Sequence, residues 1–249
     1  MTAGSVDRQL NGLAFYASRP LPCSYLPGRE TVNLFTDPDA PMSMAIYSRL
    51  ADFGFRRSGS HVYRPRCPGC QACVPARVPV RAFSPNRSQR RCKQRNADLA
   101  ITARPAAYDE EAFTLYRRYI ASRHAGGGMD DPQPDQYLSF LTSGWAETLF
   151  VEFRLQGRLM AVSVLDVLEQ GLSAVYTFFD PEQTDRSLGR LAVLWAIDEA
   201  RRRDLGWLYL GYWIADCRKM QYKQEYRPLE LLRAGAWQAF ARGARLPDE

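Results

Sequence analysis

Apolar and polar residues alternate along three neighbouring stretches in the second half of the chain. Alternation of this kind is typical of strands that bury one face. A Gln-Gly pair separates each stretch from the next, at Gln156-Gly157 and at Gln170-Gly171, and such pairs favour tight turns. The pattern therefore predicts antiparallel hairpins built from residues 147–155, 158–168 and 172–180.

Apolar residues recur at helical spacing on both sides of these strands, over residues 108–124 and 187–204. A strand over residues 206–213 and a helix over residues 216–226 follow, and Pro228 ends the helix. This order of helix, hairpin strands, long helix, strand and short helix is similar to the acyltransferase fold of the GNAT class, which binds acetyl-coenzyme A.

The expected fold class is therefore α/β (α+β), with a GNAT-like C-terminal domain over residues 105–249. Residues 1–104 are rich in Pro, Cys and Arg, and we expect a smaller Cys-containing N-terminal domain there. Coenzyme A-binding versions of the fold hold pyrophosphate on the backbone amides of a glycine-containing loop. The corresponding segment, residues 185–191, has one glycine, Gly189, which weakens the case for a coenzyme A-dependent acetyltransferase.

Composition and charge indicate where the protein is found in the cell and what kind of partner it binds. The N-terminal sequence lacks the basic start and apolar run of a signal peptide, and no stretch approaches the roughly 20 apolar residues that span a bilayer. We therefore expect a cytoplasmic protein with no membrane partner, in which six cysteines do not form a disulfide framework. The net charge of +6 favours an acidic partner. Phosphate contacts are expected from a basic block that contains Arg87, Arg90, Arg91 and Lys93.

Three cysteines at Cys67, Cys70 and Cys73 carry the strongest local chemical signal. Thiolates at this spacing can wrap one soft metal ion through a tight turn, and tetrahedral closure needs a fourth ligand. Cys23 is the candidate for that ligand. A zinc ion or an iron–sulfur cluster, reduced thiols without metal, and redox chemistry all remain open.

Few residues suggest themselves as catalytic groups. The chain has two histidines, which argues against a His-rich metal enzyme and gives little support to a Ser-His-Asp triad. His124 follows a predicted helix and precedes a glycine loop. Asp180 stands at a predicted strand end, where clefts open. Alternation places Tyr176 and Phe178 on one face of their strand, where one set of aromatic side chains could line a pocket.

Several stretches together resemble one family, the aminoacyl-tRNA–protein transferases of the N-degron pathway, and above all its bacterial branch of aspartate/glutamate leucyltransferases. The matching stretches are residues 22–30, 54–80, 83–91, 115–124, 176–181, 187–197 and 210–232. The resemblance implies a cysteine-bearing N-terminal region and an acyltransferase-like C-terminal region. It also implies transfer of an amino acid from aminoacyl-tRNA to the N-terminal amine of a protein, which marks that protein for degradation. In related eukaryotic enzymes the cysteine region is a metal or iron–sulfur site.

The implied chemistry needs a base and three kinds of substrate contact. The aminoacyl ester is already activated, so no cofactor is required for the chemistry, and a base can assist attack by the amine. Asp180 is the first candidate for that base, with His124 and Tyr176 beside it. An acidic first residue on the acceptor calls for a cation, for which Arg64, Arg77 and Lys223 are candidates. A leucyl pocket must be apolar, and Phe178, Tyr212 and Trp213 are candidates for its lining. The basic block would contact the acceptor stem of tRNA.

Three alternatives to leucyl transfer follow from the same residues. Arginyl transfer from Arg-tRNA would use the same mechanism but want an acidic donor pocket, whereas the candidate lining is aromatic. A coenzyme A-dependent acetyltransferase would bind that coenzyme directly. A non-enzymatic nucleic-acid adaptor would need only the basic block and not so large a C-terminal region.

Overall fold

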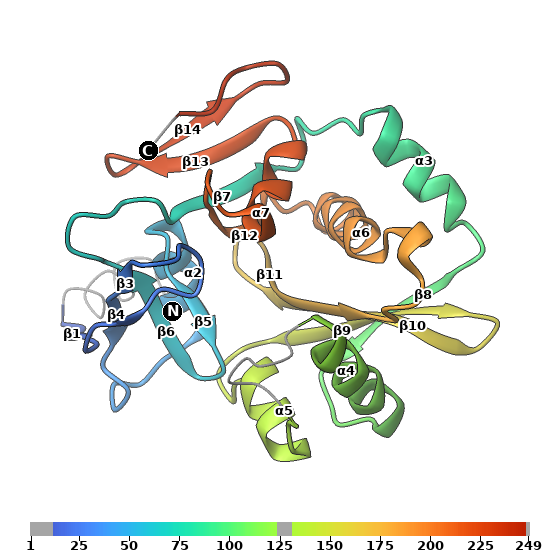
Figure 1. Ribbon diagram of the computed structural model, residues 1–249, viewed down its shortest axis with the longest axis horizontal. Helices are drawn as coiled ribbons and strands as arrows, with labels where there is room; N and C mark the ends of the chain where they lie inside the picture. Colours follow the sequence, from blue (N-terminus) through green and yellow to red (C-terminus); the bar gives the residue numbers. More distant parts are fainter. Residues whose placement is uncertain (1–11, 124–130, 248–249) are drawn as a thin grey trace.

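The computed structural model describes residues 12–123 and 131–247 (Figure 1). Within these ranges, eight strands form a large mixed sheet. Their order is β14 (Ala236–Phe240), β13 (Leu229–Arg233), β7 (Val74–Pro79), β12 (Trp207–Trp213), β11 (Gly171–Phe179), β10 (Arg158–Val167), β9 (Thr148–Leu155) and β8 (Ala100–Pro105). The pair β11–β12 is parallel, and the other neighbouring pairs are antiparallel. The mixed α/β architecture expected from the sequence is therefore present.

The hairpins predicted from the alternating stretches are confirmed. Strands β9, β10 and β11 pair antiparallel in chain order, and Gly157 adopts a φ of 86° in the first turn. Alternation along β9 sends Phe150 to one face of the sheet and Val151 to the other, where they join different core clusters.

Helices cover both faces of the sheet (Figure 1). On one face, α4 (Glu110–Arg123) and α5 (Pro134–Leu141) bury Tyr116 and Tyr137 against the hairpin strands. On the other face, α6 (Leu188–Arg202) packs its apolar stripe against β10, β11 and β12, and α3 (Arg87–Arg95) lies against α6. Helices α4 and α6 match the predicted helices, whereas α5 was not predicted. No described helix combines the length and apolar composition needed to cross a bilayer.

The N-terminal part forms a smaller unit beside the large sheet. In the described ranges its strands make a four-stranded sheet and a two-stranded one. The first has the order β1 (Phe15–Ala17), β4 (Asn33–Thr36), β6 (His61–Pro65) and β5 (Arg56–Ser58), and the second pairs β2 (Leu21–Pro22) with β3 (Glu30–Thr31). Helix α2 (Met44–Asp52) packs Tyr47 and Leu50 in a shared cluster with Leu168 and Tyr209 of the C-terminal part.

The predicted boundary between residues 104 and 105 lies inside β8. Strand β7, which precedes that boundary, is a central strand of the large sheet between β12 and β13. The two predicted regions therefore share one sheet and a continuous core.

Strands β11 and β12 pair over only three residues, Gly171–Ser173 with Trp207–Tyr209. Beyond this point they are no longer paired, and the register of β12 against β7 shifts between Tyr209 and Gly211. Gly211 has a φ of 78°, a left-handed backbone conformation that favours glycine. The irregularity therefore lies where the small sheet meets the large one.

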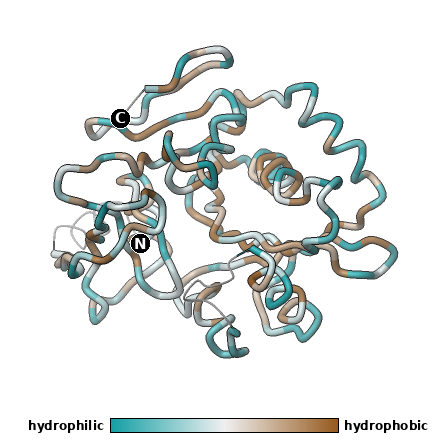
Figure 2. The backbone as a smooth tube through the Cα atoms, viewed as in Figure 1, coloured by the Kyte–Doolittle hydropathy of each residue, from teal (hydrophilic) through white to brown (hydrophobic). Residues whose placement is uncertain are grey.

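After β12 the chain makes two short helical pieces, α7 (Arg218–Gln221) and the 3-10 turn η2 (Tyr222–Glu225). The predicted helix over residues 216–226 is thus shorter and interrupted. A further 3-10 turn, η1 (Thr184–Arg186), precedes α6. Figure 2 shows α3 as mostly hydrophilic along the tube.

Candidate functional site

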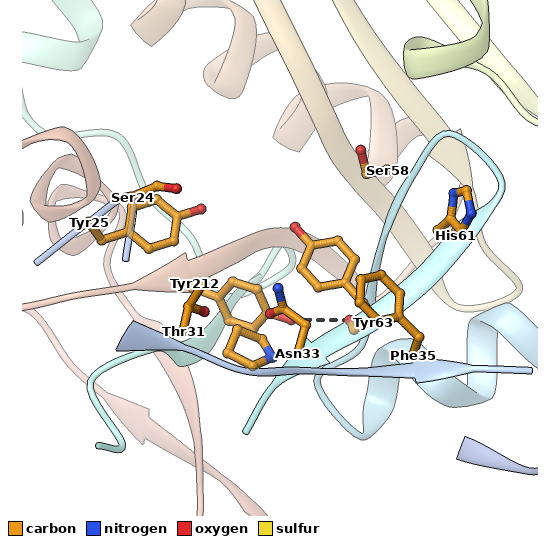
Figure 3. Close-up of a pocket in the computed structure, with 10 residues that line it drawn as sticks. Ser24, Tyr25, Thr31, Asn33, Phe35, Ser58, His61, Tyr63 and Tyr212 are labelled. Carbon is orange, nitrogen blue, oxygen red and sulfur yellow. Dashed lines mark hydrogen bonds between the residues drawn. The ribbon is translucent and has the colours of Figure 1, made fainter. Parts of the chain in front are cut away.

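A cavity of about 440 Å³ lies between the small sheet and β12 (Figure 3). Its lining is mostly hydroxyl-bearing and aromatic: Ser24, Tyr25, Thr31, Asn33, Phe35, Ser58, His61, Tyr63, Pro65 and Tyr212. This size matches sites that hold small ligands or the end of a peptide. Among the residues that the structure describes, this lining includes no lysine, arginine or carboxylate.

Strand register decides which side chains face the cavity. In the antiparallel pair β5–β6, Ser58 lies opposite His61 and Arg56 lies opposite Tyr63. Directly opposed residues share a face, and residues two apart along a strand do so too. Because Ser58, His61 and Tyr63 line the cavity, Arg56 is on the cavity face as well.

Tyr212 closes the cavity from the large sheet. Its hydroxyl donates to the backbone oxygens of Gly54, at 3.0 Å, and Tyr63, at 3.3 Å (Figure 3). Burial raises the pKa of Tyr212 well above its ordinary value, and burial raises the pKa of Tyr25 to about 12. These rings therefore stay neutral and act as hydrogen-bonding walls at physiological pH.

Lys223 lies below this wall with 3% of its surface exposed. Its Nζ donates to the backbone oxygen of Tyr212 at 2.6 Å and contacts Met220 Sδ at 2.9 Å. Burial, with the positive charge of Arg56, lowers the pKa of Lys223 to about 7. A proton on Lys223 is thus held weakly near neutral pH.

The four predicted metal ligands, Cys23, Cys67, Cys70 and Cys73, are free thiols that converge on one side of the same region. Burial, and then the charges of the other three, raise the pKa of Cys73 to about 12. The backbone N–H of Val32 donates to Cys67 Sγ at 3.4 Å. Within the described ranges, however, no three His, Cys, Asp or Glu side chains are arranged as a metal ion requires.

The predicted carboxylate receptors Arg64 and Arg77 lie away from the cavity. Arg64 is opposite Leu34 on the other face of the small sheet, and its Nη1 donates to Phe53 O at 2.8 Å. Arg77 is buried and pairs with Glu230 at 2.6 Å and with Asp52 at 3.2 Å. Both of its acidic partners come from distant parts of the chain, so the sequence did not reveal that this guanidinium is occupied.

The predicted catalytic groups do not meet at the cavity either. Asp180 is fully buried, and its two oxygens accept from Arg118 at 3.0 Å and Arg158 at 2.6 Å. Tyr176 packs among the rings of the α4 side, in contact with Phe140. His124 lies outside the described residues.

Two of the predicted leucyl-pocket residues belong to the core. Phe178 is fully buried against Tyr116, with ring centroids 5.3 Å apart. Trp213 points to the opposite face of β12 from Tyr212 and joins the cluster around α6. The third, Tyr212, is the one of the three that lines the cavity.

The predicted tRNA-binding residues all lie on α3 and are exposed. Lys93 pairs with Asp198 of α6, and Arg90 Nη1 donates to Pro85 O at 2.7 Å. Arg87 and Arg91 have no side-chain partner in the described part of the chain. They leave two unengaged cations on the surface.

Comparison with known proteins now identifies the family. Residues 21–91 match the family model described as the N terminus of arginine-tRNA-protein transferase, and residues 111–233 match its C terminus. The chain belongs to the arginine-tRNA-protein transferase family. Both parts of the transferase are present, and the cavity lies where residues of the first part meet β12 of the second.

Curated relatives of this transferase align over nearly its whole length. An aspartate/glutamate leucyltransferase of Pseudomonas putida (strain GB-1) is 55% identical over 229 residues, which cover 92% of this chain and 97% of the relative. The protein of the same name from Pseudomonas paraeruginosa (strain DSM 24068 / PA7) is 53% identical over 93% of this chain and 98% of its own. A solved structure, L-PGS from Bacillus licheniformis, is 11% identical with a TM-score of 0.49, over 79% of this chain and 62% of its own.

Arg56 of this transferase lies on the cavity face but was not singled out from the sequence. It stands in the arginine pair Arg56-Arg57, within a stretch that also carried the family resemblance. The sequence offered one indication of this position. If residues 56–58 form a strand, alternation places the side chains of Arg56 and Arg57 on opposite faces of the sheet.

Proposed function

We propose that the protein transfers leucine from leucyl-tRNA to the N-terminal α-amine of proteins that begin with Asp or Glu. The observation that carries this proposal is the 53–55% identity to proteins named aspartate/glutamate leucyltransferase, over more than nine-tenths of both chains. The substrates would accordingly be an aminoacyl-tRNA and a protein N-terminus.

The reaction is the aminolysis of an ester. The neutral α-amine attacks the leucyl carbonyl carbon, a C–N bond forms, and the bond from that carbon to the ribose oxygen breaks. The amine gives up one proton and the ribose oxygen gains one. The protein's task is to align amine and ester and to stabilise the oxyanion, because the donor is already activated.

The GNAT-like assignment of the C-terminal part is included in this proposal. Its support is the element order β8, α4, α5, β9, β10, β11, α6 and β12, with β11 and β12 parallel and separating after three paired residues. The order agrees with the acyltransferase arrangement expected from the sequence. In this chain the separation of β11 and β12 lies next to the small sheet, which contributes Arg56 there.

No step of the proposed reaction passes through a metal. The four cysteines converge but do not form a metal-binding group among the described residues. A zinc ion or iron–sulfur cluster on Cys23, Cys67, Cys70 and Cys73 stays a prediction from the sequence. Elemental analysis and the visible absorption spectrum of protein purified without oxygen test it.

The test of the function is transfer of labelled leucine or arginine from charged tRNA to peptides that begin with Asp, Glu or Ala. We expect leucine to move to the Asp and Glu peptides and not to the Ala peptide. Transfer of arginine in place of leucine would show that the donor is arginyl-tRNA, while the reaction would still be aminoacyl transfer to a protein N-terminus. No transfer from either donor, with protein prepared anaerobically, would contradict the proposal.

A further inference from the structure

Two basic side chains, Arg56 and Lys223, lie close to each other near the cavity. Neither Arg56 nor Lys223 pairs with a carboxylate in the ranges that the structure describes. Arg56 lies close enough to Lys223 for its charge to help lower the pKa of the lysine. A guanidinium keeps its charge at physiological pH and buried charges are normally paired, so an arginine without an acidic partner indicates a site for an anion.

The guanidinium of Arg56 has most of its hydrogen-bonding capacity free. It has five N–H donors, and in the described part of the chain one of its nitrogens, Nη2, donates, to the backbone oxygen of Ala174 at 2.8 Å. Ala174 is the first residue of β11 after the last one paired with β12. This contact fixes the guanidinium at the point where the two strands separate and leaves its other donors available.

Gly211 makes room for this guanidinium. A Cβ atom at position 211 would lie 1.6 Å from Arg56 Nη1 and 2.3 Å from its Cζ. The guanidinium also lies 6.0 Å from the centre of the Tyr212 ring, which lines the cavity. The irregular backbone of β12 thus places an unpaired arginine beside the cavity wall.

We propose that the Arg56 guanidinium binds the side-chain carboxylate of the acceptor's first residue. This assignment rests on the proposed function and makes Arg56 the residue that selects acidic acceptors. A planar guanidinium can meet a carboxylate with two parallel hydrogen bonds, which selects Asp and Glu over their amides. Lys223 lies close by and adds positive potential when it is protonated.

The size of this partly open cavity suits the carboxylate of a terminal residue better than a phosphate within tRNA. The cavity holds about 440 Å³ and is walled by Tyr25, Tyr63 and Tyr212. A chain end can enter such a space, whereas a phosphate is flanked on both sides by nucleotides. The exposed arginines of α3 are better placed for phosphates because they lie on an open surface.

The decisive measurement is the ratio of kcat/KM for leucyl transfer to peptides that begin with Asp and with Asn. The two residues have almost the same shape, so the ratio isolates the charge. For Arg56→Gln we expect this ratio to fall by about 10- to 100-fold, the range that loss of a charge-assisted hydrogen bond produces. A ratio within one preparation does not depend on how much of the variant is folded.

Two further variants sharpen the test. Arg56→Lys keeps a cation without the fork and is expected to retain part of the preference, which also covers failure of Arg56→Gln to fold. Arg81→Gln is the matched control, because Arg81 is exposed and pairs with the exposed Asp204. We expect it to leave the Asp:Asn ratio unchanged.

The outcomes separate this proposal from the function on which it rests. Absence of leucyl transfer by the wild-type protein would overturn the function. Normal transfer by the wild type with an unchanged Asp:Asn ratio in both Arg56 variants would overturn the role of Arg56. A loss of leucyl-tRNA affinity in Arg56→Gln with the ratio unchanged would assign the guanidinium to a phosphate and also overturn the proposal.

Discussion

Arg56 and Arg57 are neighbours in the chain but have opposite environments. Arg57 makes a fully buried pair with Asp166, whereas Arg56 has no acidic partner in the described ranges. Strand alternation separates the two side chains, and this much is readable from the sequence. Their partners are not readable, because Asp166 and Ala174 are 109 and 118 residues away in the chain. Of the candidate site residues named from the sequence, Tyr212 lines the cavity, and the sequence did not single out Arg56.

Lys223 gives a prediction for the pH dependence of stability. Its folded pKa of about 7 lies below the unfolded value of 10.5, so between these values the unfolded chain holds a proton that the folded chain has released. The free energy of unfolding should therefore rise with pH through this window. Lys223→Met removes this contribution, and from pH 7 to 9 the wild type should gain roughly 2 kcal/mol relative to the variant.

Urea denaturation at several pH values measures this difference. Lys219→Met is the matched control, because Lys219 is an exposed lysine on the neighbouring short helix α7. Parallel stability curves for the wild type and Lys223→Met would show that Lys223 is not held with a lowered pKa.

In helix α3, a cap and two buried side chains determine which basic residues face solvent. Asn86 caps the helix, its side chain accepts from the Gln89 backbone N–H at 2.9 Å, and the Gln89 side chain accepts from the Asn86 backbone N–H in return. Gln89 and Cys92 are buried toward the core and fix which side faces outward. Arg87 and Arg91 lie on the exposed side, where neither has a side-chain partner among the described residues.

The double variant Arg87→Gln, Arg91→Gln should weaken binding of leucyl-tRNA and reduce its dependence on salt. Each lost phosphate contact lowers the slope of log K against log salt by about 0.7 to 0.9, so two should lower it by about 1.5. Filter binding over a range of salt concentrations measures the slope, with Arg233→Gln as an exposed arginine control. An unchanged slope would remove α3 from the tRNA interface.

The strands differ in how readily they can be predicted from the sequence. Strands β9 to β11 are 8 to 10 residues long and separated by Gln-Gly turns. The alternation of apolar and polar residues was therefore sufficient to predict these strands. The strands of the small sheet are 3 to 5 residues long, which is too short for a period to stand out. Their side chains nevertheless form most of the cavity, so its geometry depended on tertiary contacts that local patterns do not encode.

At the scale of the whole molecule, the Arg57–Asp166 pair joins the small sheet to the large one. Nε and Nη2 of Arg57 each lie 2.6 Å from an oxygen of Asp166. Nη2 also donates to Leu141 O at 2.9 Å, and Thr148 Oγ1 donates to Asp166 at 2.8 Å. Both charged side chains have no exposed surface, so their charges are balanced by each other and by these hydrogen bonds.

Breaking this network from one side should destabilise the whole protein. Arg57→Met leaves the carboxylate of Asp166 buried and uncompensated, and we expect the free energy of unfolding to fall by about 3–5 kcal/mol. Asp204→Ala breaks an exposed pair with Arg81 and should change stability by less than about 1 kcal/mol. Chemical denaturation measures both. Similar small losses in the two variants would mean that the buried pair does not hold the sheets together.

The position of β7 has a consequence for the order of events during synthesis. This strand leaves the ribosome early, yet its hydrogen-bonding neighbours on both sides, β12 and β13, come from residues 207–233. The backbone groups of residues 74–79 therefore lack their strand partners on both sides until almost the entire polypeptide has left the ribosome. The first half of the gene product cannot mature as an independent module, and a nascent chain stalled before residue 207 would present β7 to chaperones or to other nascent chains.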